Sequence, residues 1–127
     1  MENQDSFLEI AEKMVVYQLR SKWLSVSKLY NELASERGGT MSMAFILLTI
    51  HTEKGTPVTK IAPRMGMEPN SLSRILKSME KKGLIYKRKS KSDKRKVYMC
   101  LTDYGLSMRE MAMKAVFNLE NGIQNKV

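Results

Sequence analysis

Nine lysine and arginine side chains fall close together near the middle of this chain, with one carboxylate, Asp93, among them. The nine are Lys81, Lys82, Lys87, Arg88, Lys89, Lys91, Lys94, Arg95 and Lys96. Like charges at this density repel each other, and a bound polyanion would offset this repulsion. These residue types therefore predict ionic contacts with a nucleic acid backbone.

The positive charge of the chain is confined to one segment. Residues 60–96 hold 13 Lys/Arg and 3 Asp/Glu, a net of +10, and the other 9 Lys/Arg and 10 Asp/Glu sum to −1. This distribution indicates a dedicated binding face. A membrane surface also attracts cations, but no amphipathic helix with Trp, Phe and Leu anchors flanks this segment.

Two short helices are predicted ahead of the basic cluster. The first covers about 41–53, and its apolar run indicates burial on all sides. The second begins with Thr56 as N-cap and Pro57 at its first position, and ends before Gly66. Pro63 falls inside this helix and is expected to kink or shorten it.

A third helix is predicted from Glu68-Pro69 to Gly83, after the tight turn Gly66-Met67. Its inward stripe has helical spacing: Leu72, Ile75, Leu76 and Met79. A hairpin follows, with its turn at 90–94. Two helices joined by a tight turn and followed by a hairpin make a winged helix-turn-helix, so we expect a mainly α fold with a small β-hairpin wing.

The outer face of the third helix is polar and basic, and it consists of Asn70, Ser71, Ser73, Arg74, Lys77 and Lys81. Small side chains let a helix enter the major groove, and Arg74 suits bidentate contact with guanine. The two lysines suit phosphates, which orient a protein without reading sequence. The alternative is an ordinary solvated helix face.

The tip of the hairpin contains Asp93 and Arg95, two residues apart and so on one side of an extended strand. A carboxylate there can hold the guanidinium and aim it into a narrow minor groove. A loose surface ion pair is the other interpretation. Arg88, Lys91 and Lys94 complete the predicted DNA contacts of the wing.

Long helices are predicted at both ends of the chain. A single helix from Ser6 to Glu36 would be about 45 Å long, more than a domain this small can cover. Part of it is therefore expected to be buried in a second subunit. A final helix, capped by Thr102-Asp103, is expected to reach about Asn121.

Other kinds of site find little support in the sequence. Cys100, the single cysteine, is interpreted as a half-buried filler rather than an oxidant sensor, and it suits a reducing cytosol. His51 is the single histidine and has no cysteine nearby, so neither a metal nor a cofactor is expected. No catalytic constellation is apparent, and the chain is not expected to be an enzyme. The 11 methionines suit either a core or an adaptable pocket.

The length of 127 residues indicates a single domain. The acidic N-terminus does not resemble a signal peptide, and the apolar run at 41–50 is too short to span a bilayer. A cytoplasmic protein without membrane contact is expected.

Asp93, Arg95, Leu101-Thr102 and Gly105 form the spaced pattern DxRxxxxxLTxxG. This pattern resembles the wing motif of the MarR family of bacterial winged-helix transcription regulators. Further matches are Ile61-Ala62, Ser73-Arg74 and the helix end at residues 80–85. The similarity covers about residues 40–108.

The resemblance implies a homodimer that binds a pseudo-palindromic operator in double-stranded DNA, usually as a repressor, with the wing arginine in the minor groove. It implies dimerisation through terminal helices at 6–36 and 103–125, on either side of a DNA-binding lobe at 40–102. The expected interface residues are Phe7, Ile10, Met14, Leu119 and Ile123. It also suggests release by a small aromatic or lipophilic effector.

The chain ends at Val127, where many members have a further helix, so the dimer is expected to use the first and last helices present. A winged helix that contacts protein or double-stranded RNA is the alternative.

Overall fold

The computed structural model describes the backbone of residues 4–126 and the side chains of residues 6–122. Six helices and a small three-stranded sheet follow one another in these residues. In chain order they are α1 (Gln4–Ala11), α2 (Val15–Ser35), α3 (Met41–Thr49), β1 (Thr56–Pro57), α4 (Val58–Met65), α5 (Pro69–Lys81), β2 (Ile85–Lys89), β3 (Val97–Leu101) and α6 (Asp103–Lys126). The predicted fold class, mainly helical with a β-hairpin wing, is confirmed.

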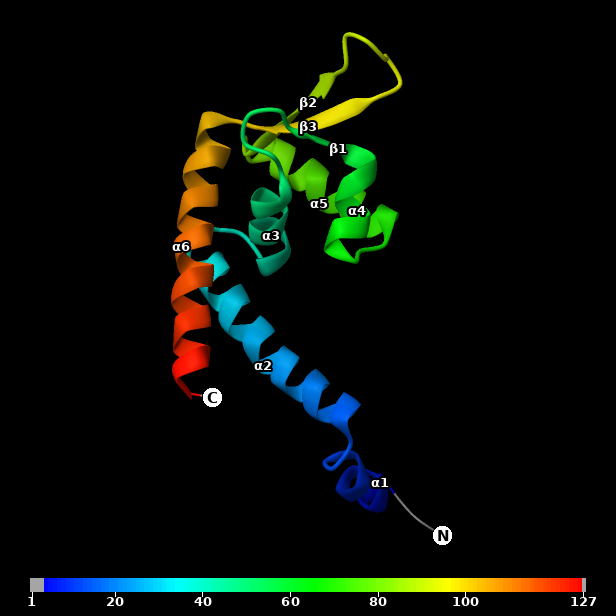
Figure 1. The fold of residues 1–127 in the computed structure, drawn as a ribbon, viewed down its shortest axis with the longest axis vertical. Helices are drawn as coiled ribbons and strands as arrows, with labels where there is room; N and C mark the ends of the chain where they lie inside the picture. The colour runs from blue at the N-terminus through cyan, green and yellow to red at the C-terminus, as the bar shows by residue number, and fades with distance from the viewer. Residues whose placement is uncertain (1–3, 127) are drawn as a thin grey trace.

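The elements divide into a compact lobe and a pair of long helices (Figure 1). The lobe comprises α3, α4, α5 and the sheet, and the β2–β3 hairpin projects from its top. Helix α6 runs down the side of α3, and α2 diverges from α6 toward α1 and the N-terminus. The long helices thus extend well beyond the lobe that carries the basic segment.

The predicted single helix from Ser6 to Glu36 is wrong, because the chain breaks it into α1 and α2. Met14 has extended backbone angles (φ −83°, ψ 134°) and precedes the first residue of α2. The β-branched Val15 and Val16 follow at once, and such side chains lower helix propensity. The Gln18 side chain donates to the Glu12 carbonyl at 2.9 Å, which gives the interrupted helix end a partner.

Helix α3 is shorter than predicted, and Thr56 does not cap the next helix. The chain leaves the helix at Ile50, which has extended backbone angles, and turns back through residues 51–55. Thr56 is buried in strand β1, and its hydroxyl accepts a hydrogen bond from His51 N at 2.9 Å. Pro57 is therefore the residue before α4 and not its first residue. A two-residue strand with one proline gives too weak a periodicity to be read from sequence.

The helix–turn–helix itself is close to the prediction. Helix α4 continues for two residues past Pro63 and ends at Gly66, whose φ of 61° is a left-handed conformation that glycine adopts without strain. Proline removes one hydrogen bond from this short helix, which is evidently tolerated. Helix α5 runs between Glu68 and Gly83 as expected.

The sheet has the order β1–β3–β2, and all pairs are antiparallel. β2 pairs with β3 along its whole length, from Ile85 opposite Leu101 to Lys89 opposite Val97. β1 pairs only with Met99 and Tyr98. The sheet therefore has three strands only at the middle of β3, and the outer end of the hairpin has two.

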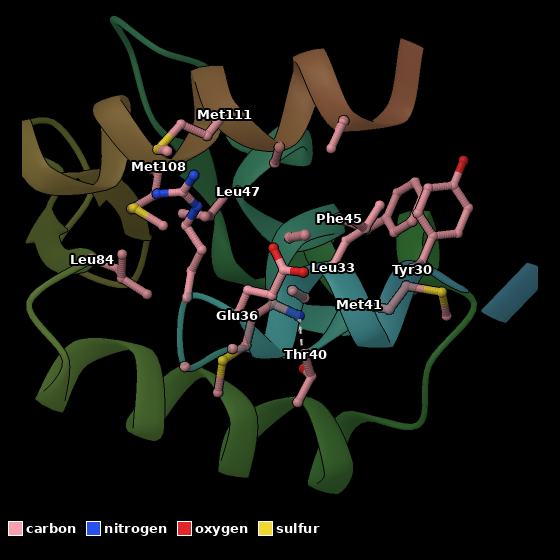
Figure 2. A pocket seen from close by; sticks show the side chains of 18 of the residues that line it. Tyr30, Leu33, Glu36, Thr40, Met41, Phe45, Leu47, Leu84, Met108 and Met111 are labelled. Carbon is pink, nitrogen blue, oxygen red and sulfur yellow. Dashed lines mark hydrogen bonds between the residues drawn. The ribbon is translucent and has the colours of Figure 1, made fainter. Parts of the chain in front are cut away.

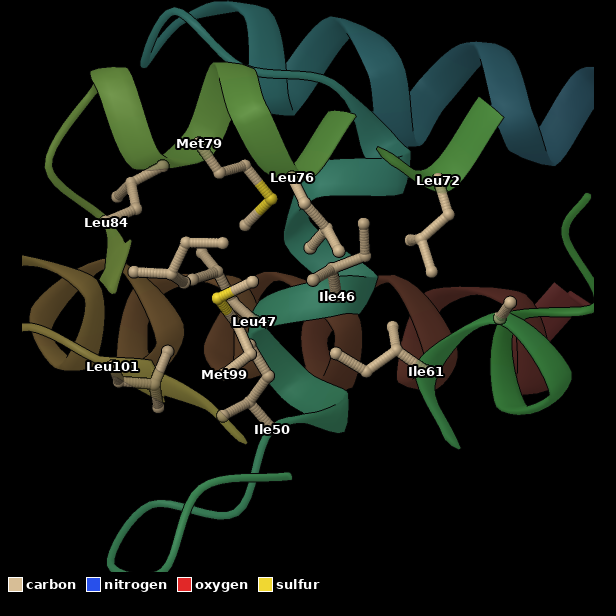
Figure 3. Packing of buried hydrophobic residues seen from close by; sticks show 12 residues of the cluster. Ile46, Leu47, Ile50, Ile61, Leu72, Leu76, Met79, Leu84, Met99 and Leu101 are labelled. Carbon is tan, nitrogen blue, oxygen red and sulfur yellow. The ribbon is translucent and has the colours of Figure 1, made fainter. Parts of the chain in front are cut away.

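One hydrophobic core orients α5 and the base of the hairpin together (Figure 3). Ile46, Ile61, Met79 and Met99 are fully buried where α3, α4, α5 and β3 meet. Figure 3 shows Leu72, Leu76 and Met79 of α5 pointing toward the side chains of α3 and β3.

Helix α6 extends to Lys126, beyond the predicted end at Asn121. Across residues 4–126, no helix is both long enough and apolar enough to cross a membrane.

Candidate nucleic-acid interface

Helix α5 has one buried face and one exposed polar face, as predicted. Leu72, Leu76 and Met79 are buried, and Ile75 is half-buried. The polar face of α5 is exposed along the helix and consists of Asn70, Ser71, Ser73, Arg74, Lys77 and Lys81. Its small side chains come in the first turns and its long cations later. This arrangement suits a helix whose N-terminal half enters a groove.

Glu68 caps α5 through its carboxylate. Oε1 accepts from Asn70 N at 3.1 Å, and Oε2 accepts from Ser71 N at 3.2 Å. The Ser71 hydroxyl also donates to Oε2, at 3.4 Å. Two of the free N–H groups at the helix start thus have partners, although glutamate is not a typical N-cap. The same carboxylate orients the Ser71 hydroxyl on the polar face.

Replacing Glu68 with alanine is expected to lower the free energy of unfolding by about 1 kcal/mol, because both N–H groups lose their acceptor. Glu68→Ser, which retains a capping oxygen, should keep most of the stability. Urea unfolding followed by circular dichroism measures both variants. Equal stability of Glu68→Ala and the parent would show that the cap contributes nothing.

The loop at the tip of the wing, residues 90–96, is folded by its own hydrogen bonds. Asp93 Oδ1 accepts from Arg95 N at 3.0 Å, and Asp93 N donates to Ser90 Oγ at 3.3 Å. Ser90 N donates to Lys96 O at 3.0 Å. The prediction that Asp93 holds the guanidinium of Arg95 is therefore wrong: the carboxylate accepts the backbone amide. The cause is the turn, since these two residues do not lie on an extended strand. Arg95 remains exposed.

Arg88 is held against the protein, although it was predicted to contact DNA. Its Nη2 donates to the carbonyl of Lys54 at 2.9 Å, and its guanidinium lies over the Tyr98 ring, 4.8 Å from the ring centre. Nearby, Lys87 Nζ lies 3.8 Å from Glu80 Oε1, which links β2 to the last turn of α5. Lys91 and Lys94, by contrast, are exposed at the tip.

Two cations of α4 were not among the predicted contacts. Lys60 and Arg64 are both exposed on this helix, which precedes α5 in the motif. Their four-residue spacing places them on one face of α4, a signal available in the sequence. The first helix of such a motif crosses the backbone of DNA, so both are added to the candidate phosphate contacts.

A cavity of about 420 Å³ lies where α2, α3 and α6 meet, and we call it the junction cavity (Figure 2). Its walls are mostly apolar, and four of the methionines line it: Met41, Met43, Met108 and Met111. Polar side chains also line the cavity, among them Arg37, Glu36 and Lys82. The Lys82 ammonium donates to the Gly38 carbonyl, which ties the end of α5 to the loop between α2 and α3. The other buried methionines, such as Met79 and Met99, fill the core.

Tyr30 forms part of the cavity wall, and its ring packs edge-on against Phe45 with 5.5 Å between ring centres. Burial raises the pKa of the Tyr30 phenol, and the negative charge of Glu120 raises it further. The phenol therefore keeps its proton at neutral pH.

The N-terminal helices present a large exposed apolar surface. Phe7 is 60% exposed, Ile10 52% and Met14 47%, and α2 adds Val16, Leu19 and Trp23. On α6, Phe117 is exposed and Leu119 is half-buried. The side chain of Ile123 lies outside the described residues. An apolar surface of this extent is typical of a protein–protein interface.

Cys100 and His51 both have structural roles. The Cys100 thiol is buried in β3, and a side chain at Gly55 would approach its sulfur to 2.7 Å. Nδ1 of His51 accepts the backbone N–H of Glu53 at 3.2 Å and of Lys54 at 3.0 Å. Within the described residues, no group of three or more His, Cys, Asp or Glu is placed to hold a metal ion.

Comparison with known proteins extends the similarity beyond the wing. The model of the MarR family matches residues 40–97. An organic hydroperoxide resistance transcriptional regulator of Bacillus subtilis is 26% identical over 113 residues, which cover 89% of this chain and 76% of that protein. The HTH-type transcriptional regulator SarZ of Staphylococcus saprophyticus is 27% identical over 121 residues, 93% of this chain and 81% of that protein.

Solved structures share the fold. The structure of the S. aureus MepR–DNA complex has a TM-score of 0.82 at 19% identity, covering 90% of this chain and 85% of that chain. The M. tuberculosis regulator MosR, also in complex with DNA, has a TM-score of 0.73 at 21% identity, covering 91% and 84%. The order of the helices and the wing is thus the same as in known winged-helix regulators.

Proposed function

We propose that the protein is a sequence-specific regulator of transcription that binds double-stranded DNA, in line with the MarR family model that matches residues 40–97. The observation that carries this proposal is the polar face of α5. Six polar or cationic side chains lie exposed on a helix that the core holds rigidly from its opposite face. The relatives that match over most of the chain are transcriptional regulators.

Each part of the surface has a proposed task. Asn70, Ser73 and Arg74 reach base edges in the major groove, and Lys77 and Lys81 meet phosphates. The tip of the wing, with Lys91, Lys94 and Arg95, follows the backbone into the adjacent minor groove. Asp93 shapes that tip and is not itself a contact.

We propose that the regulator acts as a homodimer. The exposed apolar side chains of α1, α2 and α6 would cost free energy in water, and a second copy can cover them. A two-fold dimer presents two α5 helices to successive major grooves about 34 Å apart, which a pseudo-palindromic operator matches. In this arrangement residues 6–36 and 103–125 dimerise, and residues 40–102 bind DNA.

We further propose repression that a small aromatic or lipophilic effector relieves. The junction cavity is apolar and touches both α6 and the loop that Lys82 ties to α5. A molecule bound there would contact the dimer helices and the DNA-binding lobe at once. A change at this junction alters the spacing of the two α5 helices, so DNA affinity and effector affinity are coupled.

Gel-shift titration of genomic fragments over a salt series tests the DNA proposal. The logarithm of the binding constant should fall linearly with the logarithm of salt concentration, with a slope of about −0.9 for each phosphate contacted. A few fragments should bind far more tightly than the rest, and double-stranded RNA of equal length should not displace them. A flat salt response, or equal affinity for every duplex, would contradict the proposal. It would favour a winged helix that contacts protein or RNA.

A further inference from the structure

The wing loses the support of the third strand, β1, partway along the hairpin. Strand β1 pairs with Met99 and Tyr98 of β3 and goes no further along the hairpin. Beyond Tyr98 the two strands of the wing hold one more pair, Lys89 opposite Val97, and the loop of residues 90–96 follows. An isolated two-stranded ribbon is marginally stable in water. Some contact at this boundary must therefore set the direction in which the tip points.

Arg88 stands at this boundary. It pairs with Tyr98 across β2 and β3, at the last position that β1 supports. Its guanidinium lies over the Tyr98 ring, with the ring centre 4.8 Å away, and donates to the Lys54 carbonyl at 2.9 Å. One side chain thus touches both strands of the wing and the loop that precedes β1.

The loop of residues 51–55, here called the anchor loop, is well fixed. Nδ1 of His51 accepts two of its N–H groups, and Gly55 N donates to His51 O at 3.0 Å. Gly55 packs so closely on β3 that a Cβ there would lie 2.9 Å from Met99 O. The carbonyl that receives Arg88 therefore belongs to a rigid part of the lobe.

We propose that Arg88 is a positioning residue that joins the wing to the anchor loop and so aims the tip of the wing. Its charge is used inside the protein, and the contact with DNA is made by the tip residues, Arg95 among them. The DNA part of this inference rests on the proposed function. The mechanical part concerns the free protein and can be tested without DNA.

Amide hydrogen exchange of the free protein tests the mechanical part. In Arg88→Gln, the amides of Ser90 and Lys96, which close the tip loop, should exchange about tenfold faster or more. Amides in the three-stranded part of the sheet, such as that of Met99, should be unchanged. Lys89→Gln is the matched control, because it removes the neighbouring exposed cation. Equal exchange at the tip in the two variants would overturn the proposal, whether or not the protein binds DNA.

A substitution in the anchor loop tests whether the loop holds the wing without changing the charge of Arg88. His51→Ala removes the acceptor that folds the anchor loop, and His51→Asn supplies a side-chain oxygen that can accept the same N–H groups. Tip exchange should rise in His51→Ala and return toward the parent rate in His51→Asn. Arg88→Lys, which keeps a donor and a charge, should recover part of the protection. Unchanged tip exchange in His51→Ala would show that the anchor loop does not hold the wing.

A double-mutant cycle, measured on a DNA fragment that the parent protein binds, tests whether Arg88 affects DNA binding through the tip of the wing. Arg88→Gln should weaken binding about tenfold, and Arg88→Gln combined with Arg95→Ala should be little worse than Arg95→Ala alone. Multiplication of the two effects would instead identify Arg88 as an independent phosphate contact. Failure of the parent protein to bind any fragment would remove the proposed function and leave the exchange result standing.

Discussion

Replacing Gly105 with alanine is expected to lower the free energy of unfolding by about 3 kcal/mol, a large effect for one methyl group. A Cβ at this position would lie 2.0 Å from the Leu84 carbonyl oxygen and 3.0 Å from its carbon. Real Cβ atoms do not approach oxygen so closely. The obstacle is backbone, so it cannot rotate away as the end of a side chain can.

The close approach arises because the start of α6 crosses the chain just before β2. Thr102 N donates to Leu84 O at 3.1 Å, and Thr102 Oγ1 donates to the neighbouring Gly83 O at 2.5 Å. Gly105 N then donates to Thr102 Oγ1 at 2.9 Å, which caps α6. Leu84 lies between the end of α5 and β2, so this contact joins the end of α5, the wing and α6. The Leu101-Thr102 pair and Gly105 of the wing motif thus have a packing role.

Gly122→Ala is the matched control for Gly105→Ala, because nothing lies within 4 Å of a Cβ placed there on the same helix. It should raise stability by about 0.5–1 kcal/mol, since alanine favours helix more than glycine does. Urea unfolding of both variants gives the difference. If Gly105→Ala were as stable as Gly122→Ala, the crossing of α6 over Leu84 would be wrong.

The sequence predicts those parts of the fold that local signals determine. Helix α5 has an apolar stripe, a proline at its start and a glycine at its end, and all three indicate the same bounds. The strand at Thr56 has no such signal, and it depends on pairing made after the chain has folded, where Thr56 accepts from His51 N within the sheet. At Met14 the only local signal is the β-branched pair Val15 and Val16, which is too weak to predict a break. Local propensity is a weak guide when tertiary contacts decide.

The same distinction applies to the candidate site. The exposed face of α5 follows from helical spacing, so its residues could be named in advance. The contact between Arg88 and the Lys54 carbonyl could not be predicted, because Lys54 is 34 residues away in the chain. Asp93 was misassigned for a different reason: a two-residue spacing implies a shared side only on an extended strand, and here it lies in a turn. The junction cavity likewise requires the positions of three helices.

Replacing Arg95 with alanine is expected to weaken binding to the operator about 10- to 100-fold, the loss of about 1–3 kcal/mol that one specific contact supplies. The side chain is exposed on the tip loop, and its backbone is fixed by Asp93. A preorganised arginine loses less entropy on entering a narrow minor groove, where the negative potential is strongest. The loss should be greatest on operators with A·T-rich flanks and smaller when the flanks are G·C-rich.

Two comparisons isolate the role of Arg95 in gel-shift titrations. Lys81→Ala should lower affinity uniformly across flank sequences and reduce the salt slope by about 0.9, as expected for one phosphate contact. Asp93→Asn keeps an oxygen that can accept from Arg95 N, so it should bind at least as well as the parent, and Asp93→Ala should bind more weakly. Only a minor-groove contact responds to flank sequence. If Arg95→Ala weakened binding to all operators equally, Arg95 would therefore be identified as another phosphate contact. A variant that binds like the parent would place the tip of the wing away from DNA altogether.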